Sequence, residues 1–188
     1  ALREDVGRGD LTSMLTIPAH TRARGLLLAK QDGVMAGGYV VAECFRQSDP
    51  GGSFEQTVAE GAPFTAGDCL GTVTGSARGL LGAERVALNF LQRLCGVATL
   101  TRRFVDRIAG TGARITDTRK TTPGLRLLEK YAVRTGGGRN HRFHLGDGIL
   151  IKDNHLTALR ALGMSLKEIA LKARQNAPQG MTVEIEVS

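Results

Sequence analysis

The stretch from Arg114 to His155 reads R-I-T-D-T-R-K-T-T-P-G-L-R-L-L-E-K-Y-A-V-R-T-G-G-G-R-N-H-R-F-H-L-G-D-G-I-L-I-K-D-N-H. Two short apolar runs within it, residues 114–116 and 148–151, lead directly into charged residues. A short apolar run bounded by turn residues is typical of a buried strand in an α/β protein. A helix-like segment and a triple glycine lie between the two runs. The stretch therefore predicts a parallel α/β unit.

Charged side chains follow each of these predicted strands. Asp117, Arg119 and Lys120 come after the first strand, and Lys152 and Asp153 come after the second. In parallel α/β folds, residues just past the carboxyl ends of the strands face the ligand crevice. We therefore expect the cations to converge on one cavity. Several fixed arginines and lysines in one cavity favour a small ligand with several negative charges.

Three glycines, residues 136–138, precede the pair His141–Arg142. Glycines allow the backbone to approach a ligand closely, although such a run is also typical of a flexible turn. His141, His144 and His155 are candidate metal ligands, but their spacing fits no common zinc pattern. The sequence also contains no phosphate-binding G-x-x-x-x-G-K-[ST] loop and no G-x-S-x-G nucleophile motif.

The sequence ends in a predicted helix at residues 165–175 and a predicted strand at 181–187. Alternation along that strand places Glu184 and Glu186 on one face. Carboxylates inside a parallel strand are costly unless they point at a site, a metal or cationic partners. Exposure at the edge of a sheet is the alternative.

The first half of the chain predicts a separate structural unit. Residues 1–24 form a lead-in in which Asp10, Thr12 and Ser13 are candidate turn or helix-cap residues. Residues 22–74 alternate short strands with glycine turns. A helix at 39–47 is expected to pack on the resulting antiparallel sheet. Residues 80–109 show apolar side chains at helical spacing and end at Gly110 and Gly112, a typical helix stop.

Bulk composition limits the classes of function. The formal net charge of the 188 residues is +7, which favours anionic partners, either nucleic acid or small phosphates. Cys44, Cys69 and Cys95 lack metal-ligand spacing and are expected to be reduced thiols. No apolar run is long enough to span a bilayer, and the N-terminus lacks a signal-peptide pattern. We therefore expect a cytoplasmic protein, and the abrupt ends of the chain suggest a fragment.

Six ordered motifs occur together in this chain. They are E-R-V-A-L-N-F-L-Q-R-L-C-G-V-A-T, D-T-R-K-T-T-P-G-L-R, E-K-Y-A-V, G-G-G-R-N-H-R, L-I-K-D-N-H and E-I-E-V. Together with G-D-L-T-S at residues 9–13, they resemble the quinolinate phosphoribosyltransferase family over essentially the whole chain. The chain departs from the family at Cys95, where a small serine is usual, and it lacks the family's C-terminal portion.

The resemblance implies a fold, an assembly and a reaction. It implies an N-terminal α/β sandwich domain with a linking helix (residues 1–96) and the first part of an α/β-barrel catalytic domain of parallel strands (residues 97–188). It also implies a homodimer. The reaction would transfer a phosphoribosyl group from phosphoribosyl pyrophosphate (PRPP) to quinolinate with magnesium, giving nicotinate mononucleotide, pyrophosphate and carbon dioxide.

The resemblance also implies site residues by motif. Lys120, Lys152 and Glu186 would act in catalysis, and Mg²⁺ would be held mainly through PRPP, with no protein metal ligand assigned. The residues implied for substrate binding are Arg85 (reaching into the neighbouring subunit's site), Thr118, Arg119, Lys120, His141, Arg142, Lys152 and Glu186. Planar arginines suit the two carboxylates of quinolinate, and lysines suit phosphates.

Two alternatives stay open. A paralogue of the same fold would act on another aromatic acceptor such as nicotinate. A basic nucleic-acid-binding module would explain the charge, but aromatic residues make up only 4% of the chain and the cations sit at strand ends.

Overall fold

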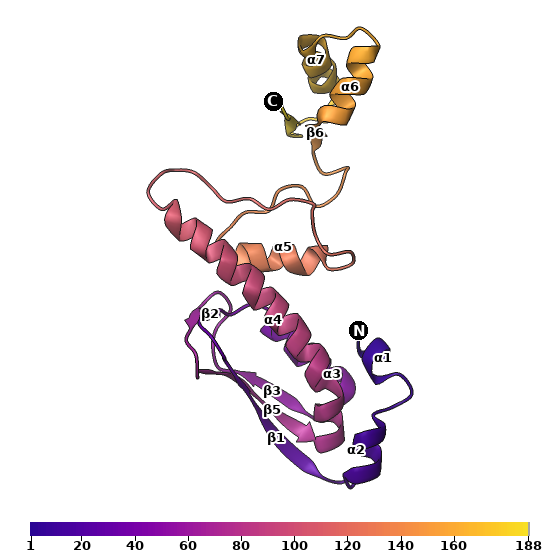
Figure 1. The fold of residues 1–188 in the computed structure, drawn as a ribbon, viewed down its shortest axis with the longest axis vertical. Coiled ribbons are helices and arrows are strands. Elements are labelled where there is room, and N and C mark those ends of the chain that lie inside the picture. Colours follow the sequence, from indigo (N-terminus) through magenta and orange to yellow (C-terminus); the bar gives the residue numbers. More distant parts are fainter. Residues whose placement is uncertain (188) are drawn as a thin grey trace. The chain divides into compact units, whose positions relative to one another are not determined.

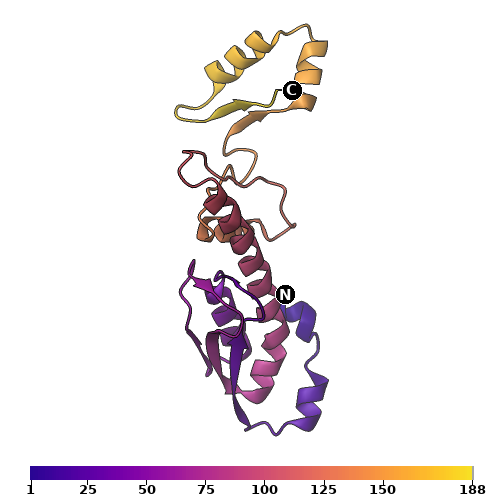
Figure 2. The same cartoon turned by 60° about the vertical axis from the view of Figure 1, so that its left-hand side comes forward.

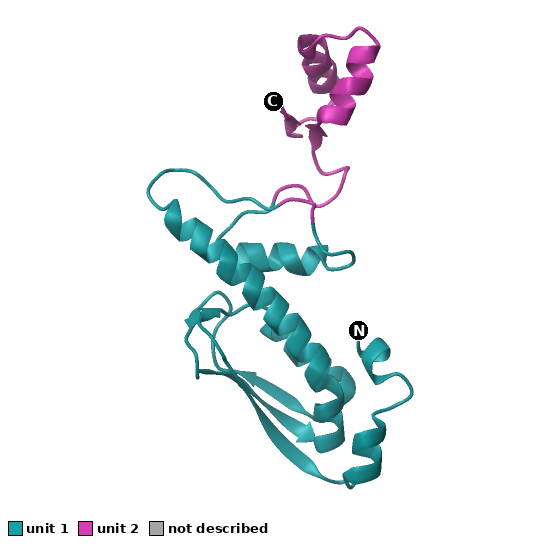
Figure 3. Cartoon of the chain, viewed as in Figure 1, with its two compact units in different colours: residues 1–117, 121–140 teal, residues 118–120, 141–188 magenta. Residues whose placement is uncertain are grey.

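The computed structural model describes residues 1–187, and the chain forms two compact units. Unit 1 consists of residues 1–117 and 121–140, and unit 2 of residues 118–120 and 141–188 (Figure 3). The tripeptide Thr118–Lys120 therefore groups with the second half of the chain, although residues on both sides of it belong to unit 1.

Unit 1 begins with two short helices, α1 (Leu2–Val6) and α2 (Leu11–Thr16). Of the three candidate turn or cap residues, Asp10 is the N-cap of α2, because its carboxylate accepts a hydrogen bond from the Ser13 backbone N–H at 3.1 Å.

An antiparallel three-stranded sheet follows, in the order β1-β5-β3. Its strands are β1 (Arg22–Leu28), β3 (Ser53–Gln56) and β5 (Cys69–Ser76). A second, two-stranded sheet pairs β2 (Gly33–Val34) with β4 (Pro63–Phe64). The predicted antiparallel sheet is therefore confirmed.

Helices α3 (Gly38–Ser48) and α4 (Ala77–Arg107) cover one face of this sheet (Figures 1 and 2). Both were predicted from their apolar spacing. The core between helices and sheet includes Met35, Val41, Val73, Ala83 and Leu91. The result is the α/β sandwich that the family resemblance implies.

Helix α5 (Arg126–Thr135) packs on the C-terminal half of α4, where Ala132 contacts a cluster that includes Leu94 and Ala98. The glycine run after α5 makes this packing possible. A Cβ at Gly136 would collide with the carbonyl of Ala98, and one at Gly138 would lie 2.9 Å from Thr101. The sequence suggested that these glycines let the backbone come close to a ligand. In the structure, the backbone at Gly136 and Gly138 comes close to α4.

The predicted strand at residues 114–116 is wrong. The structure has only an isolated parallel bridge there, between Thr116 and Arg139. Its hydrogen bonds run from Arg139 N to Ile115 O (2.9 Å) and from Asp117 N to Arg139 O (3.1 Å). The ladder stays this short because its partner emerges from the glycine turn just two residues earlier, at Gly137 (φ 93°). The apolar run lacks a partner long enough to make it a strand.

Unit 2 is a small parallel α/β unit. Strands β6 (Ile149–Ile151) and β7 (Val183–Ile185) pair in parallel, and α6 (Asp153–Ala161) and α7 (Leu166–Asn176) connect them. Ile151, Leu156 and Ile169 form its buried core. Helix α6 was not predicted, because its polar first turn, D-N-H, gives no apolar periodicity. In residues 1–187, no helix has the length and apolar character needed to cross a bilayer.

Candidate active site

The carboxyl ends of β6 and β7 bring Lys152 and Glu186 together. Ile151 pairs with Ile185 in the parallel register, so the next residue along each strand lies side by side with its neighbour. The Lys152 ammonium Nζ lies 3.0 Å from Glu186 Oε2, and the backbone N–H of Glu186 donates to Ile151 O at 2.9 Å. Both side chains remain about half exposed, at 42% and 60%. This pair is therefore accessible to a ligand at the strand ends.

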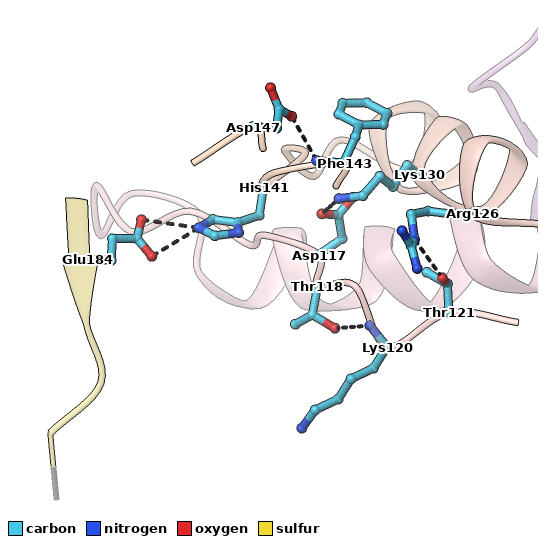
Figure 4. Close-up of polar contacts among 10 residues, drawn as sticks. All are labelled: Asp117, Thr118, Lys120, Thr121, Arg126, Lys130, His141, Phe143, Asp147 and Glu184. Atoms are coloured by element: carbon cyan, nitrogen blue, oxygen red, sulfur yellow. Dashed lines mark hydrogen bonds and ion pairs between the residues drawn. The ribbon is translucent and has the colours of Figure 1, made fainter. Parts of the chain in front are cut away.

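His141 contacts the other acidic residue of β7. Its Nε2 lies 3.1 and 3.0 Å from the two carboxylate oxygens of Glu184 (Figure 4). Each carboxylate of the E-I-E-V segment thus has a basic partner. The structure shows features of both readings of these acids, edge exposure and cationic partners, because each carboxylate has a basic partner and both side chains are about half exposed, at 43% and 60%.

Arg142 is held against the segment that leads into β6. Its Nη1 donates to the carbonyl of Gly148 at 2.9 Å, and the side chain is partly buried. The intervening turn is closed by a hydrogen bond from Phe143 N to Asp147 Oδ2 at 2.8 Å. The bond to Gly148 holds one N–H group of the guanidinium against the backbone. A guanidinium has five N–H donors, so the others can bind further partners.

The cationic tripeptide (Thr118–Lys120) belongs to the same unit as these residues. Thr118 Oγ1 accepts a hydrogen bond from the Lys120 backbone N–H at 3.0 Å (Figure 4), which makes a local turn. Arg119 is partly buried, whereas Lys120 is exposed. Unit 2 therefore contains every predicted site residue except Arg85.

Lys130 of α5 forms an ion pair with Asp117, the residue directly before the cationic tripeptide (Figure 4). The Lys130 side chain is 0% exposed and that of Asp117 is 7% exposed. A fully buried lysine is rare unless it is paired. Lys130 lies in the E-K-Y-A-V motif, but its sequence context alone predicts no role for it.

Glu129, the preceding residue of α5, is also buried and binds the other side of the tripeptide. Its carboxylate accepts hydrogen bonds from Arg93 Nη2 (2.6 Å) and from the backbone N–H of Thr122 (3.3 Å). Burial raises the pKa of Glu129, but these hydrogen bonds outweigh it and the pKa lies below its usual value. Sequence reasoning missed this residue too.

Arg85 lies in unit 1, on α4, where its side chain is exposed. Within residues 1–187 the structure gives it no hydrogen bond or ion pair.

The acidic residues of β7 are suitable in kind for Mg²⁺, which prefers carboxylate, phosphate and water oxygens. Among residues 1–187, however, no group of three or more His, Cys, Asp or Glu side chains is placed to hold a metal ion.

The fold and site define a two-domain α/β protein with basic and acidic side chains at the ends of parallel strands, a class suited to small anionic substrates. Residues 10–95 match the sequence model of the quinolinate phosphoribosyl transferase N-terminal domain, and residues 97–188 match that of the C-terminal domain. The chain belongs to the quinolinate phosphoribosyl transferase family.

Similar proteins agree with this assignment. A probable nicotinate-nucleotide pyrophosphorylase (carboxylating) of Synechocystis sp. is 42% identical over 187 residues, covering 100% of this chain and 62% of the relative. One of Bacillus subtilis is 44% identical, covering 98% of this chain and 62% of the relative. The crystal structure of NadC from Streptococcus pyogenes matches with a TM-score of 0.90 at 44% identity, covering 100% of this chain and 66% of that one. The chain thus spans less than two thirds of the length of these relatives.

Proposed function

We propose that the protein transfers the phosphoribosyl group of PRPP to quinolinate and decarboxylates the adduct. The products would be nicotinate mononucleotide, pyrophosphate and carbon dioxide. The reaction belongs to NAD biosynthesis, and the enzyme would be a pentosyltransferase. The family membership supports this proposal, as do the relatives named for that activity.

The observation that carries the proposal is the lysine–glutamate pair at the carboxyl ends of β6 and β7. It places an ammonium for phosphate oxygens directly beside a carboxylate for a developing positive charge.

The remaining predicted residues have complementary roles in the proposal. Arg119, Arg142 and His141 bind the two carboxylates of quinolinate, since a planar arginine forms paired hydrogen bonds with a carboxylate. Thr118 binds substrate through its hydroxyl. Lys120 acts with Lys152 on the PRPP phosphates as a point charge.

The chemistry would proceed in two steps. The quinolinate ring nitrogen forms a bond to the ribose C1, and the bond from C1 to pyrophosphate breaks with its electron pair on the leaving group. Glu186 stabilises the oxocarbenium-like ribose. The bond to the 2-carboxylate then breaks and CO₂ leaves. Its electron pair stays at ring C2, stabilised by the cationic ring nitrogen, until a proton replaces the carboxylate.

Magnesium would neutralise charge on the pyrophosphate group. In the proposal the ion is held mainly by PRPP, with Glu186 as a neighbouring oxygen donor. The protein's own lysines then orient the phosphates around it.

Three further assignments are part of the proposal. The protein is a homodimer, in which the exposed Arg85 enters the site of the neighbouring subunit. Residues 1–96 form the sandwich domain with its linking helix, and residues 97–188 form the first part of the barrel domain. The protein acts in the cytoplasm.

A turnover assay on the full-length protein tests the choice of acceptor. With PRPP and Mg²⁺, quinolinate should give nicotinate mononucleotide and CO₂, and nicotinate should be a poor acceptor. Preference for nicotinate would instead support a paralogous activity on the same fold.

Arg119→Ala tests the assignment of the acceptor site. Calorimetric titration of quinolinate should show binding lost in the full-length variant, with the circular dichroism spectrum unchanged. Loss of one charged bidentate contact corresponds to at least about tenfold in affinity. Arg46→Ala is the matched control, because Arg46 forms an ion pair with Glu43 of its own helix, α3. Unchanged affinity in Arg119→Ala would remove Arg119 from the site.

A further inference from the structure

We propose that Glu129 and Lys130, consecutive residues of α5, are positioning residues that hold the two ends of the cationic tripeptide and so set the geometry of quinolinate binding. This inference rests on the proposed function. It adds two residues to which neither the sequence motifs nor the family membership gives a role.

The first end of the tripeptide is held at Asp117. The Lys130 ammonium and the Asp117 carboxylate are almost completely buried. Asp117 is also fixed through its backbone, because its N–H donates to the carbonyl of Arg139 at 3.1 Å. The residue before Thr118 therefore has little freedom to move.

The second end is held just beyond Lys120. Glu129 accepts from the Thr122 backbone N–H, and Arg93 bridges the same carboxylate to the Thr122 hydroxyl at 3.0 Å. Arg126, one turn before Lys130 on α5, donates from Nε to Thr121 Oγ1 at 3.1 Å. Three residues of one helix thus bind the chain on both sides of the tripeptide.

Asp117 is also hydrogen-bonded to Arg139, which lies two residues before His141 in the sequence. Residues 115–117 and Arg139 are joined by the parallel bridge, so the chain leaves unit 1 toward Thr118 and toward His141 from neighbouring points. Within unit 1, Asp117 is therefore held both by Lys130 and by the backbone of Arg139.

A buried ion pair is weak evidence for a stabilising role, because desolvation offsets its attraction. A neutral pair of similar volume would serve stability as well. A charged pair at the base of a substrate-binding segment has a clearer use in orientation, since misplacing a contact by about 1 Å can lower the rate about a hundredfold.

The experiment compares Lys130→Met, Asp117→Asn and the double variant in the full-length protein. Each single variant leaves a buried charge or polar group without its partner and should lower the Tm. The double variant removes both charges and should recover part of that loss, because the amide at position 117 stays buried. We expect kcat/KM for quinolinate to stay at least about tenfold below wild type in the double variant.

The two roles make opposite predictions for the double variant. If the pair serves stability alone, kcat/KM returns with the Tm to within about twofold of wild type, which overturns the inference for this pair. Arg46→Met, which removes an exposed ion pair on α3 (side chains 64% and 46% exposed), should change neither quantity.

Thr122→Val decides the question if the double variant does not fold. Thr122 is exposed, so this variant should keep the wild-type Tm. It loses only the hydroxyl that Arg93 contacts, and the KM for quinolinate should rise about two- to fivefold. An unchanged KM would overturn the inference for the second end of the tripeptide, where Arg93 joins the Glu129 carboxylate to the Thr122 hydroxyl. An inactive wild-type protein with quinolinate would instead contradict the proposed function.

Discussion

Tyr131 shows how a single side chain connects the sandwich to α5. Its hydroxyl donates to Glu60 Oε2 at 2.5 Å, and its ring meets that of Tyr39 edge-on with centroids 5.1 Å apart. Burial, followed by the hydrogen bond to the Glu60 carboxylate, raises the pKa of Tyr131 to about 12. The neutral phenol is therefore the form that the folded protein retains.

This raised pKa predicts an alkaline dependence of stability. In the unfolded chain the tyrosine loses its proton near pH 10, whereas the folded chain keeps it until about pH 12. The free energy of unfolding should therefore fall as the pH rises from about 10 to about 12, because the unfolded state binds fewer protons there. Urea titrations of wild type and Tyr131→Phe would show a smaller fall in the variant. Equal slopes would contradict the assignment.

At the same scale, sequence reasoning named candidate basic residues for a site, which stay predictions, but it missed the buried pair Glu129 and Lys130. Arg119, Arg142 and Lys152 were predicted because they follow apolar runs or glycines. Glu129 and Lys130 look like an ordinary solvated pair in the sequence, since charged residues on helices are usually exposed. Only the packing of α5 on α4 places both of them in the interior.

Among the elements, α3 begins without a capping side chain of its own. Its N-cap is Gly37, which has φ 99°. Glu60 takes over the role, because its carboxylate accepts from the backbone N–H groups of Gly37 (2.9 Å) and Gly38 (2.7 Å). A carboxylate at a helix N-terminus is also favoured by the helix dipole.

Glu60→Ala should therefore lower the free energy of unfolding by about 1–2 kcal/mol, the usual effect of losing a helix cap. Chemical denaturation followed by circular dichroism measures this change. Glu55→Ala, at an exposed carboxylate of β3, is the control and should shift stability by less than about 0.5 kcal/mol. Equal effects of the two substitutions would show that Glu60 caps nothing.

The elements also separate what a sequence pattern can predict from what it cannot. Apolar spacing identified α3, α4, α7 and the strands β6 and β7, because each buries one face. The failure at residues 114–116 has a different origin: pattern shows that a segment can pair but not how long its partner is. Helix α6 was missed because its buried contacts are mainly those of Leu156.

At the scale of the whole molecule, the two units differ in how much they bury. The core of unit 1 joins sheet, α3 and α4 through a large cluster of buried side chains, with a second cluster beneath α5. The core of unit 2 consists of Ile151, Leu156 and Ile169 with partly buried neighbours. Smaller buried apolar area means a lower free energy of local opening.

Amide hydrogen exchange of the 188-residue chain should reflect this difference. Amides of β6 and β7 should exchange at least about tenfold faster than those in the middle of α4. Mass spectrometry of peptides from the two regions would measure the ratio. Equal protection would show that the units open together.

Helix α4 has one further consequence. The two family matches meet between residues 95 and 97, in the interior of a continuous helix of 31 residues. At about 1.5 Å per residue this rod is roughly 46 Å long, and every turn is bonded to the next. The backbone at this boundary is helical, so a protease that needs an extended substrate should not cleave there. Anyone building chimaeras from two such enzymes should exchange the rod whole instead of cutting it where the family halves meet.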